Sequence, residues 1–118
     1  MVCQKKIVTM ASLRRGEIVW VNLDPTVGGE IKKQRPCIIV SLSALNEKRL
    51  TVVVVPLSSA GTPRPPLVVK VPSAGAHSNA RVDQIRAVDK SRITGNLGHL
   101  SRPEMAEIEL ALRTILGI

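Results

Sequence analysis

The chain has 118 residues, of which 44% are hydrophobic, and 17 Lys and Arg against 9 Asp and Glu give it a formal net charge of +8. This length and composition are typical of one folded domain with its own core and exclude a disordered chain. The excess of positive charge favours a polyanionic partner, such as nucleic acid, an anionic membrane surface or an acidic protein segment. No stretch is long enough to span a membrane, and a chain without Phe or Tyr is a poor candidate for a module built on several aromatic stacking platforms.

The chain is predicted to form a single domain over residues 14–118, preceded by a flexible extension over residues 1–13, with no internal repeats. Met10 is a second candidate start, and the short apolar stretch around it does not have the length of an export signal. Cys3 and Cys37 fit no metal or redox spacing. Cys37 lies in an apolar stretch and is predicted to be a buried free thiol, which favours a reducing, cytoplasmic location.

The first predicted hairpin consists of strands over residues 17–23 and 37–42, joined by a basic loop that is expected to be flexible. Gly28 and Gly29 remove two side chains from this loop, and Pro36 keeps the backbone of Arg35 extended. Trp20, in the first strand, is predicted to be a half-buried packing residue.

A short helical stretch over residues 43–48, with Ser43 as its cap, is expected to follow. Residues 50–57 include four consecutive valines and predict a central strand buried on both faces. Pro56 cannot donate to a ladder, so regular pairing is expected to fail near it and to leave Ser58 and Ser59 at a strand terminus.

Three further strands are predicted over residues 67–71, 80–89 and 93–100, with loops over residues 60–66 and 73–79. The apolar residues of the second of these strands change phase at Ile85, which predicts a bulge or bend.

The last element is a predicted helix that begins with the capping box Ser101-Arg102-Pro103-Glu104 and ends at Gly117. Met105, Ile108, Leu112 and Ile115 share one face of this helix, and Glu109 with Arg113 is expected to form an exposed pair. Many short strands and one late helix predict a mainly β (α+β) fold, in which a strongly bent sheet or small barrel carries a C-terminal helix.

Polar residues gather where the predicted strands end, which suits a groove for a polyanion. They are Glu30, Lys33, Arg35, Ser58, Ser59, Arg81, Asp83, Gln84 and Arg86. Each also has a structural alternative, such as an Arg81–Asp83 pair or a turn capped by Ser58. His77 and His99 are isolated, and no cluster of carboxylates predicts a metal site.

Several motifs follow one another along the chain: residues 15–26 (RGEIVWVNLDPT), Gly28-x-Glu30, Arg35-Pro36, residues 54–59 (VVPLSS), residues 82–89 (VDQIRAVD) and Arg92-Ile93. Their order and spacing resemble the MazF/PemK ribonuclease toxins over almost the whole chain from Leu13. The resemblance implies an SH3-like or CcdB-like twisted-sheet barrel that works as a homodimer. It also implies an mRNA interferase that cleaves single-stranded RNA at specific sequences without metal and is opposed by a cognate acidic antitoxin.

The family's site residues carry over position by position. Arg35 matches the catalytic arginine, and Ser58 matches a position usually held by a catalytic threonine. In the Kid branch a histidine, an arginine and an aspartate carry the chemistry; Arg81 and Asp83 match the last two, but Gly29 stands at the histidine position. The resemblance therefore favours Arg35 and Ser58 as the catalytic pair, with no metal or other cofactor. It implies RNA contacts from Gly29, Glu30, Lys33, Ser59, Arg81, Asp83, Gln84 and Arg86.

On this reading, the 2′-hydroxyl of the RNA is the nucleophile and the products are a 2′,3′-cyclic phosphate and a 5′-hydroxyl. Asp83 and Glu30 both remain candidates for the general base. Two alternatives stay open: a CcdB-like toxin that binds gyrase without nuclease activity, and an inactive nucleic-acid-binding relative.

Overall fold

A computed structural model of the chain describes residues 13–31 and 33–118. The expected extension therefore lies outside the described residues except for Leu13, which is buried in the core. Across the part of the chain that the structure describes, no helix is both long and apolar enough to cross a membrane.

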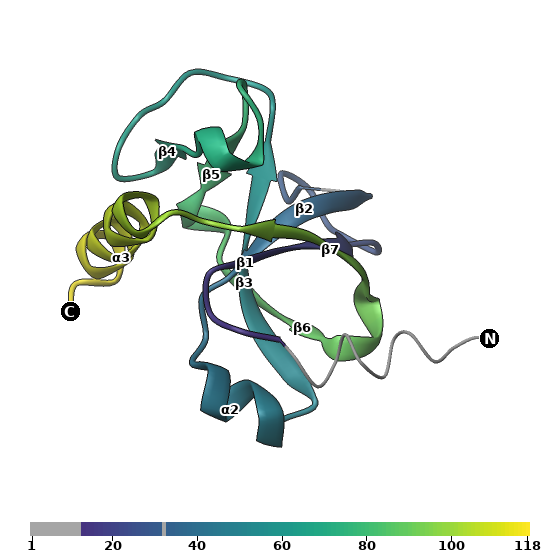
Figure 1. Cartoon of the computed structure of the whole chain (residues 1–118). Helices are drawn as coiled ribbons and strands as arrows, with labels where there is room; N and C mark the ends of the chain where they lie inside the picture. The colour runs from purple at the N-terminus through teal and green to yellow at the C-terminus, as the bar shows by residue number, and fades with distance from the viewer. Residues whose placement is uncertain (1–12, 32) are drawn as a thin grey trace.

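A seven-stranded sheet forms the body of the molecule, in the order β4-β5-β3-β2-β1-β7, and β6 also pairs with β3 (Figure 1). The strands are β1 Glu17–Asn22, β2 Gln34–Ile39, β3 Thr51–Ser58, β4 Val68–Lys70, β5 Asn79–Arg81, β6 Arg86–Asp89 and β7 Ile93–His99. The helices are α2 Ser43–Lys48 and α3 Arg102–Leu116, with 3₁₀ turns η1 Pro72–Ala74, η2 Val82–Gln84 and η3 Lys90–Arg92. The strand pairs are antiparallel, and the fold is mainly β with a C-terminal helix, as predicted.

The sheet has a hydrophobic cluster on each face, because successive side chains of a strand point to opposite sides. One cluster includes Ile18 and Ile38 and packs against Ile108 of α3. The other includes Val19 and Cys37 from the same two strands. Trp20 projects from the first face and keeps 37% of its surface exposed, so it is only partly covered, as expected for a half-buried packing residue.

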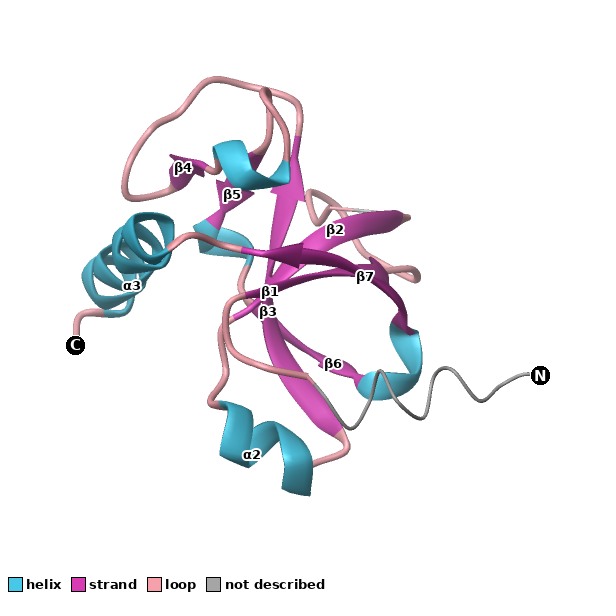
Figure 2. Ribbon diagram, viewed as in Figure 1, coloured by secondary structure: helices cyan, strands magenta, loops and turns pink. Residues whose placement is uncertain are grey.

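β3 runs through the middle of the molecule, and Figure 2 shows it extending from α2 to the long loop before β4. The expectation that pairing fails at Pro56 is only partly correct. β3 pairs with β6 as far as Val54 and with β5 from Leu57, so Pro56 lies where one side of the ladder changes partner. A proline is tolerated there because no N–H is required of it on that side. The strand therefore continues through the proline and ends at Ser58, so Ser58 lies at a strand terminus, as expected.

The predicted bend near Ile85 is a complete break. Residues 80–89 form two short strands, β5 and β6, separated by the 3₁₀ turn η2, instead of one bulged strand. The change of phase in the sequence arises because β5 and β6 pair with different parts of β3.

Helix α3 begins with the predicted capping box of Ser101 and Glu104 and ends at Gly117, whose φ of +71° is left-handed. Its predicted apolar face packs on the core. The expected Glu109–Arg113 pair is wrong, because Glu109 instead forms an ion pair with Arg15 at 2.8 Å. A partner from a distant segment cannot be read from helical spacing.

The expected cap of α2 is also wrong. The N-cap position is Leu42 and makes no side-chain cap hydrogen bond. Ser43 lies within the first turn, and its hydroxyl accepts a hydrogen bond from the backbone N–H of Arg15 at 3.0 Å. The serine thus joins the N-terminal segment to α2.

Candidate ribonuclease site

Arg35 and Ser58 lie on neighbouring strands of the sheet. Pairing between β2 and β3 ends at Cys37 and Pro56, and the same antiparallel register continued by two residues would put Arg35 opposite Ser58. Residues opposite each other on adjacent strands project from the same face. Both side chains are half-buried, and the alternation along β2 and β3 puts them on the face that carries Cys37 and Val54.

Ser58 is also directly opposite Asn79 on β5. The hydroxyl of Ser58 accepts a hydrogen bond from the N–H of Ala60 at 3.1 Å, so it does cap the turn that follows β3. This bond uses a lone pair and leaves the hydroxyl proton available to a ligand. Asn79 was not among the predicted site residues, although its alternation with Arg81 along one strand was a signal that both share a face.

Arg81 projects from this same face, next to Pro56 if the β3–β5 register is continued by one residue. Its Nε is buried without a hydrogen-bond partner. The alternative in which Arg81 pairs with Asp83 is not found: the turn η2 begins between them, and among the described residues neither forms an ion pair with the other. A buried N–H without a partner is costly in a folded protein, so a ligand oxygen at this position would relieve that cost.

The break in the β3 ladder opens a groove. Its volume is about 410 Å³, and its lining includes Pro56 of β3 and Ile85 between η2 and β6. Five of the predicted site residues also line it: Gly29, Glu30, Asp83, Gln84 and Arg86. The groove therefore joins the β1–β2 loop to the segment around η2, two parts of the chain that lie far apart in sequence.

The β1–β2 loop is tied to the body of the molecule, in contrast to the flexible loop expected from its glycines. The side chain of Gln84 accepts from the N–H of Ile31 at 2.8 Å and donates to the carbonyl of Gly29 at 3.4 Å. Arg92 donates to the carbonyl of Asp24 at 2.5 Å. The sequence could not reveal these contacts, because they join residues more than 50 positions apart.

Within the loop, Glu30 and Lys33 have different environments. The carboxylate of Glu30 accepts from the N–H of Val27 at 2.6 Å and so closes the turn. Lys33 has a left-handed backbone with φ of +68°, and its N–H donates to the carboxylate of Asp24 at 3.0 Å. The Lys33 side chain is exposed and available to an anion.

The two loop glycines also differ. Gly28 has a φ of +60°, whereas a Cβ added to Gly29 would meet no atom within 4 Å. Only Gly28 is needed for its backbone conformation, so Gly29 leaves open space beside the groove.

Arg86 lies on the same face as the groove, opposite Val54 on β3. It donates to the carbonyl of Leu23 at 3.4 Å. The charge of Arg86 also acts on the Cys37 thiol. Burial raises the pKa of this thiol to about 12, and the positive charge of Arg86 opposes part of that rise. Cys37 is a buried free thiol, as predicted, and stays protonated at neutral pH.

Ser59 is a predicted site residue that does not line this groove. It is exposed and lines a separate cavity of about 230 Å³ together with Lys70, His77 and Asn79. Among the described residues, no three His, Cys, Asp or Glu side chains come close enough together to hold a metal ion.

Comparison with known proteins places these features in a family. The PemK-like, MazF-like toxins of type II toxin-antitoxin systems match residues 14–116. Endoribonuclease MazF9 of Mycobacterium tuberculosis is 31% identical over 115 residues, which cover 90% of this chain and 98% of that protein.

Two solved structures share the fold. The crystal structure of MazF from Deinococcus radiodurans has a TM-score of 0.81 at 27% identity, covering 91% of this chain and 98% of that one. An endoribonuclease in complex with its cognate antitoxin, from a mycobacterial species, has a TM-score of 0.75 at 27% identity, covering 90% and 96%. The chain therefore belongs to the family of PemK-like, MazF-like toxins of type II toxin-antitoxin systems.

Proposed function

We propose that this protein is an endoribonuclease toxin that cleaves single-stranded RNA at specific sequences without a metal ion, using Arg35 and Ser58. The named activity of the similar MazF9 supports an endoribonuclease over a gyrase-binding toxin. The assignment of residues rests on the alternation of side chains along β2 and β3, which puts Arg35 and Ser58 on one face of two neighbouring strands. Neither residue lines the groove, but Pro56, two residues before Ser58, does.

The substrate supplies its own nucleophile. The 2′-oxygen attacks the adjacent phosphorus and gives up its proton to a base; the bond from phosphorus to the 5′-oxygen breaks, and that oxygen takes up a proton. The products are a 2′,3′-cyclic phosphate and a 5′-hydroxyl, and no water is consumed. The protein must align these atoms and stabilise the negative charge that builds on the phosphate.

Arg35 stabilises this charge, because a guanidinium can donate two parallel hydrogen bonds to phosphate oxygens. The Ser58 hydroxyl donates to the 2′-oxygen or to a phosphate oxygen. Arg81 adds its buried Nε–H, which has no protein partner, and Lys33 and Arg86 bind the flanking backbone. The groove beside them receives bases, since its walls combine peptide groups with Pro56 and Ile85.

The partner that controls this activity is an acidic antitoxin segment that occupies the same face. Support comes from the similar mycobacterial endoribonuclease, whose structure contains its cognate antitoxin, and from the net charge of +8. We also place the toxin in the cytoplasm as a homodimer, for which sedimentation equilibrium should give twice the mass of the chain.

The test is cleavage of a single-stranded RNA in excess chelator by the parent protein and by Arg35→Ala and Ser58→Ala. Replacing Arg35 should lower kcat by a factor of several hundred, because losing a donor to the transition-state charge costs about 3–4 kcal/mol. Ser58→Ala should also lower kcat. DNA of the same sequence should remain intact, since it lacks the 2′-hydroxyl.

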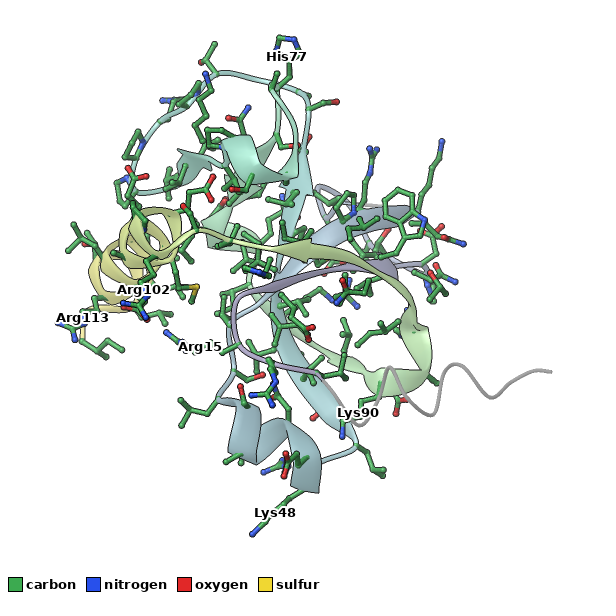
Figure 3. The ribbon with its side chains drawn as sticks, viewed as in Figure 1. Arg15, Lys48, His77, Lys90, Arg102 and Arg113 are labelled. Carbon is green, nitrogen blue, oxygen red and sulfur yellow. The ribbon has the colours of Figure 1, made fainter. Side chains whose placement is uncertain are left out.

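Arg102→Ala is the matched control, because Arg102 is an exposed arginine on α3 (Figure 3) and should leave kcat unchanged. Loss of cleavage on adding chelator, or an Arg35→Ala protein that cuts as fast as Arg102→Ala, would refute the mechanism. Intact RNA together with inhibition of gyrase would instead support the binding toxin.

A further inference from the structure

A row of polar side chains crosses three strands at the upper end of the sheet. Ser58 of β3 is opposite Asn79 of β5, and Asn79 is opposite Lys70 of β4. Opposite residues of an antiparallel pair project from the same face, so Ser58, Asn79 and Lys70 form a line across the strands. Continuing the β2–β3 register adds Arg35 at the other end of this line.

The opposite face of the same strands is apolar, which fixes this orientation. Leu57, Val69 and Ala80, the residues beside this row, are all buried in the cluster that packs on α3. Lys70 is exposed, whereas Asn79 is only 4% exposed. Burial of the row's apolar neighbours thus holds Lys70 on the outer face.

The row ends in the cavity of about 230 Å³ that Lys70 and Asn79 line together with Ser59 and His77. The amide of Asn79 donates to the carbonyl of Gly61 at 3.3 Å, which ties down the loop that forms one wall. This lining contains a lysine and a histidine but no carboxylate, whereas the groove at Pro56 is lined by two carboxylates, Glu30 and Asp83, and one arginine, Arg86. The negative backbone of a nucleic acid is therefore favoured on the Lys70 side.

We propose that this cavity is a subsite for the RNA segment that leaves the cleavage site on the β4 side, with Lys70 binding a phosphate beyond the scissile one. Neighbouring strands are about 4.8 Å apart, so the Cα atom of Lys70 lies about 10 Å from the Cα atom of Ser58. At this separation, Lys70 binds a different phosphate from Arg35. Asn79 provides a polar floor between the two, and His77 offers a ring on which a base can stack. Lys70 is a positioning residue, and this role rests on the proposed ribonuclease function.

The experiment measures the Kd of RNA whose 2′-hydroxyl at the cleavage site is replaced by hydrogen, for the parent, Lys70→Met and Lys48→Met. Lys48 is the matched control: it is an exposed lysine on α2, at the opposite end of the molecule from the loop that carries His77 (Figure 3). Methionine keeps the length of the side chain and removes its charge. Lys70→Met should raise the Kd on the order of tenfold, because a hydrogen bond to a charged group is lost. For Lys70→Met, the slope of the logarithm of the RNA association constant against the logarithm of the salt concentration should be smaller by about 0.7 than for the parent.

A set of RNAs, each with one neutral methylphosphonate, then locates the contact. At one position other than the scissile phosphate, neutralisation should weaken binding to the parent and to Lys48→Met but have no further effect on Lys70→Met. The subsite is refuted if Lys70→Met binds like Lys48→Met, or if no single phosphate accounts for the loss. Cleavage of unmodified RNA by the parent tests the ribonuclease function separately, so a parent that cuts normally while Lys70→Met binds normally refutes only the subsite.

Discussion

Asp83 and Glu30 both line the groove, but their hydrogen bonds give them different roles. The carboxylate of Glu30 is held by the N–H of Val27 at 2.6 Å, so it maintains the turn of the β1–β2 loop. Asp83 is exposed in η2, and among the described residues its carboxylate forms no ion pair. Of the two candidates for the general base, we therefore expect Asp83 to be the one that accepts the proton of the substrate hydroxyl.

Asp83→Asn and Glu30→Gln should therefore have different kinetic effects. Asp83→Asn should lower kcat by about 10²–10⁴-fold, the usual contribution of a general base. Glu30→Gln keeps an oxygen that can accept from Val27 and should change KM more than kcat. Single-turnover and steady-state cleavage of one RNA would distinguish these effects, and an unchanged kcat for Asp83→Asn would remove it as the base.

At the scale of elements, the position of Pro56 in β3 explains where the groove forms. A proline cannot donate to a ladder, and the side of β3 that meets η2 changes partner there, from β6 to β5. The groove forms at this change of partner, with Pro56 in its lining. A strand that paired continuously on both sides would have no such opening.

The start of α3 is fixed by a buried carboxylate. Burial alone would raise the pKa of Glu104, but hydrogen bonds from Ser73 and Ser101 outweigh it and lower the pKa to about 2. These bonds include the N–H groups of Ser73 and Ser101, both at 2.8 Å. Glu104 therefore joins the helix cap to η1 as well as closing the capping box.

Stability should consequently fall in acid. A carboxyl whose pKa is lower in the folded than in the unfolded state stabilises the fold above its unfolded pKa, and this contribution is lost as the pH falls through its folded pKa. The fall from 4.5 to about 2 corresponds to about 3 kcal/mol. Urea unfolding from neutral pH down to about pH 2 should show this loss for the parent, whereas Glu104→Gln should lack this part of the pH dependence.

Glu107→Gln provides the control, since Glu107 is exposed on the same helix and should unfold with the pH dependence of the parent. If the free energy of unfolding of Glu104→Gln declined in acid as steeply as that of Glu107→Gln, the hydrogen-bonded carboxylate would not be the cause.

At the scale of the whole molecule, one face of the sheet packs against a helix and the other carries the polar residues of the candidate site. One face is covered by α3 and supplies the larger apolar cluster. The other face carries the second cluster and, beyond its edge, the polar residues around Ser58. The polar residues around Ser58 thus lie on the face opposite to α3, and the net charge of +8 suits a long, flexible polyanion.

An acidic antitoxin segment should compete with RNA for this face. Titrating such a peptide into the cleavage reaction should raise the apparent KM without changing kcat, and the inhibition should weaken as salt is added, because the attraction is electrostatic. A fall in kcat at constant KM would show that the peptide acts at a surface that RNA does not occupy.

Much of the fold followed from local patterns. The valines of β3, the capping box of α3 and the change of phase at Ile85 each predicted an element or a break, because they act over a few neighbouring residues. The predictions that were wrong involve distant partners: Glu109 pairs with Arg15, and Ser43 accepts from Arg15 instead of capping α2.

The sequence by itself determined the family, the order of the elements and the residue types available for chemistry, because motifs and periodicity are properties of neighbouring positions. Only the tertiary structure decided that Arg35 and Ser58 share a face, that Gln84 and Arg92 hold the β1–β2 loop, and that Asn79 and Lys70 extend the row from Ser58. Those relations depend on the register between strands, which is set by the burial of one face of the sheet and which no single segment encodes.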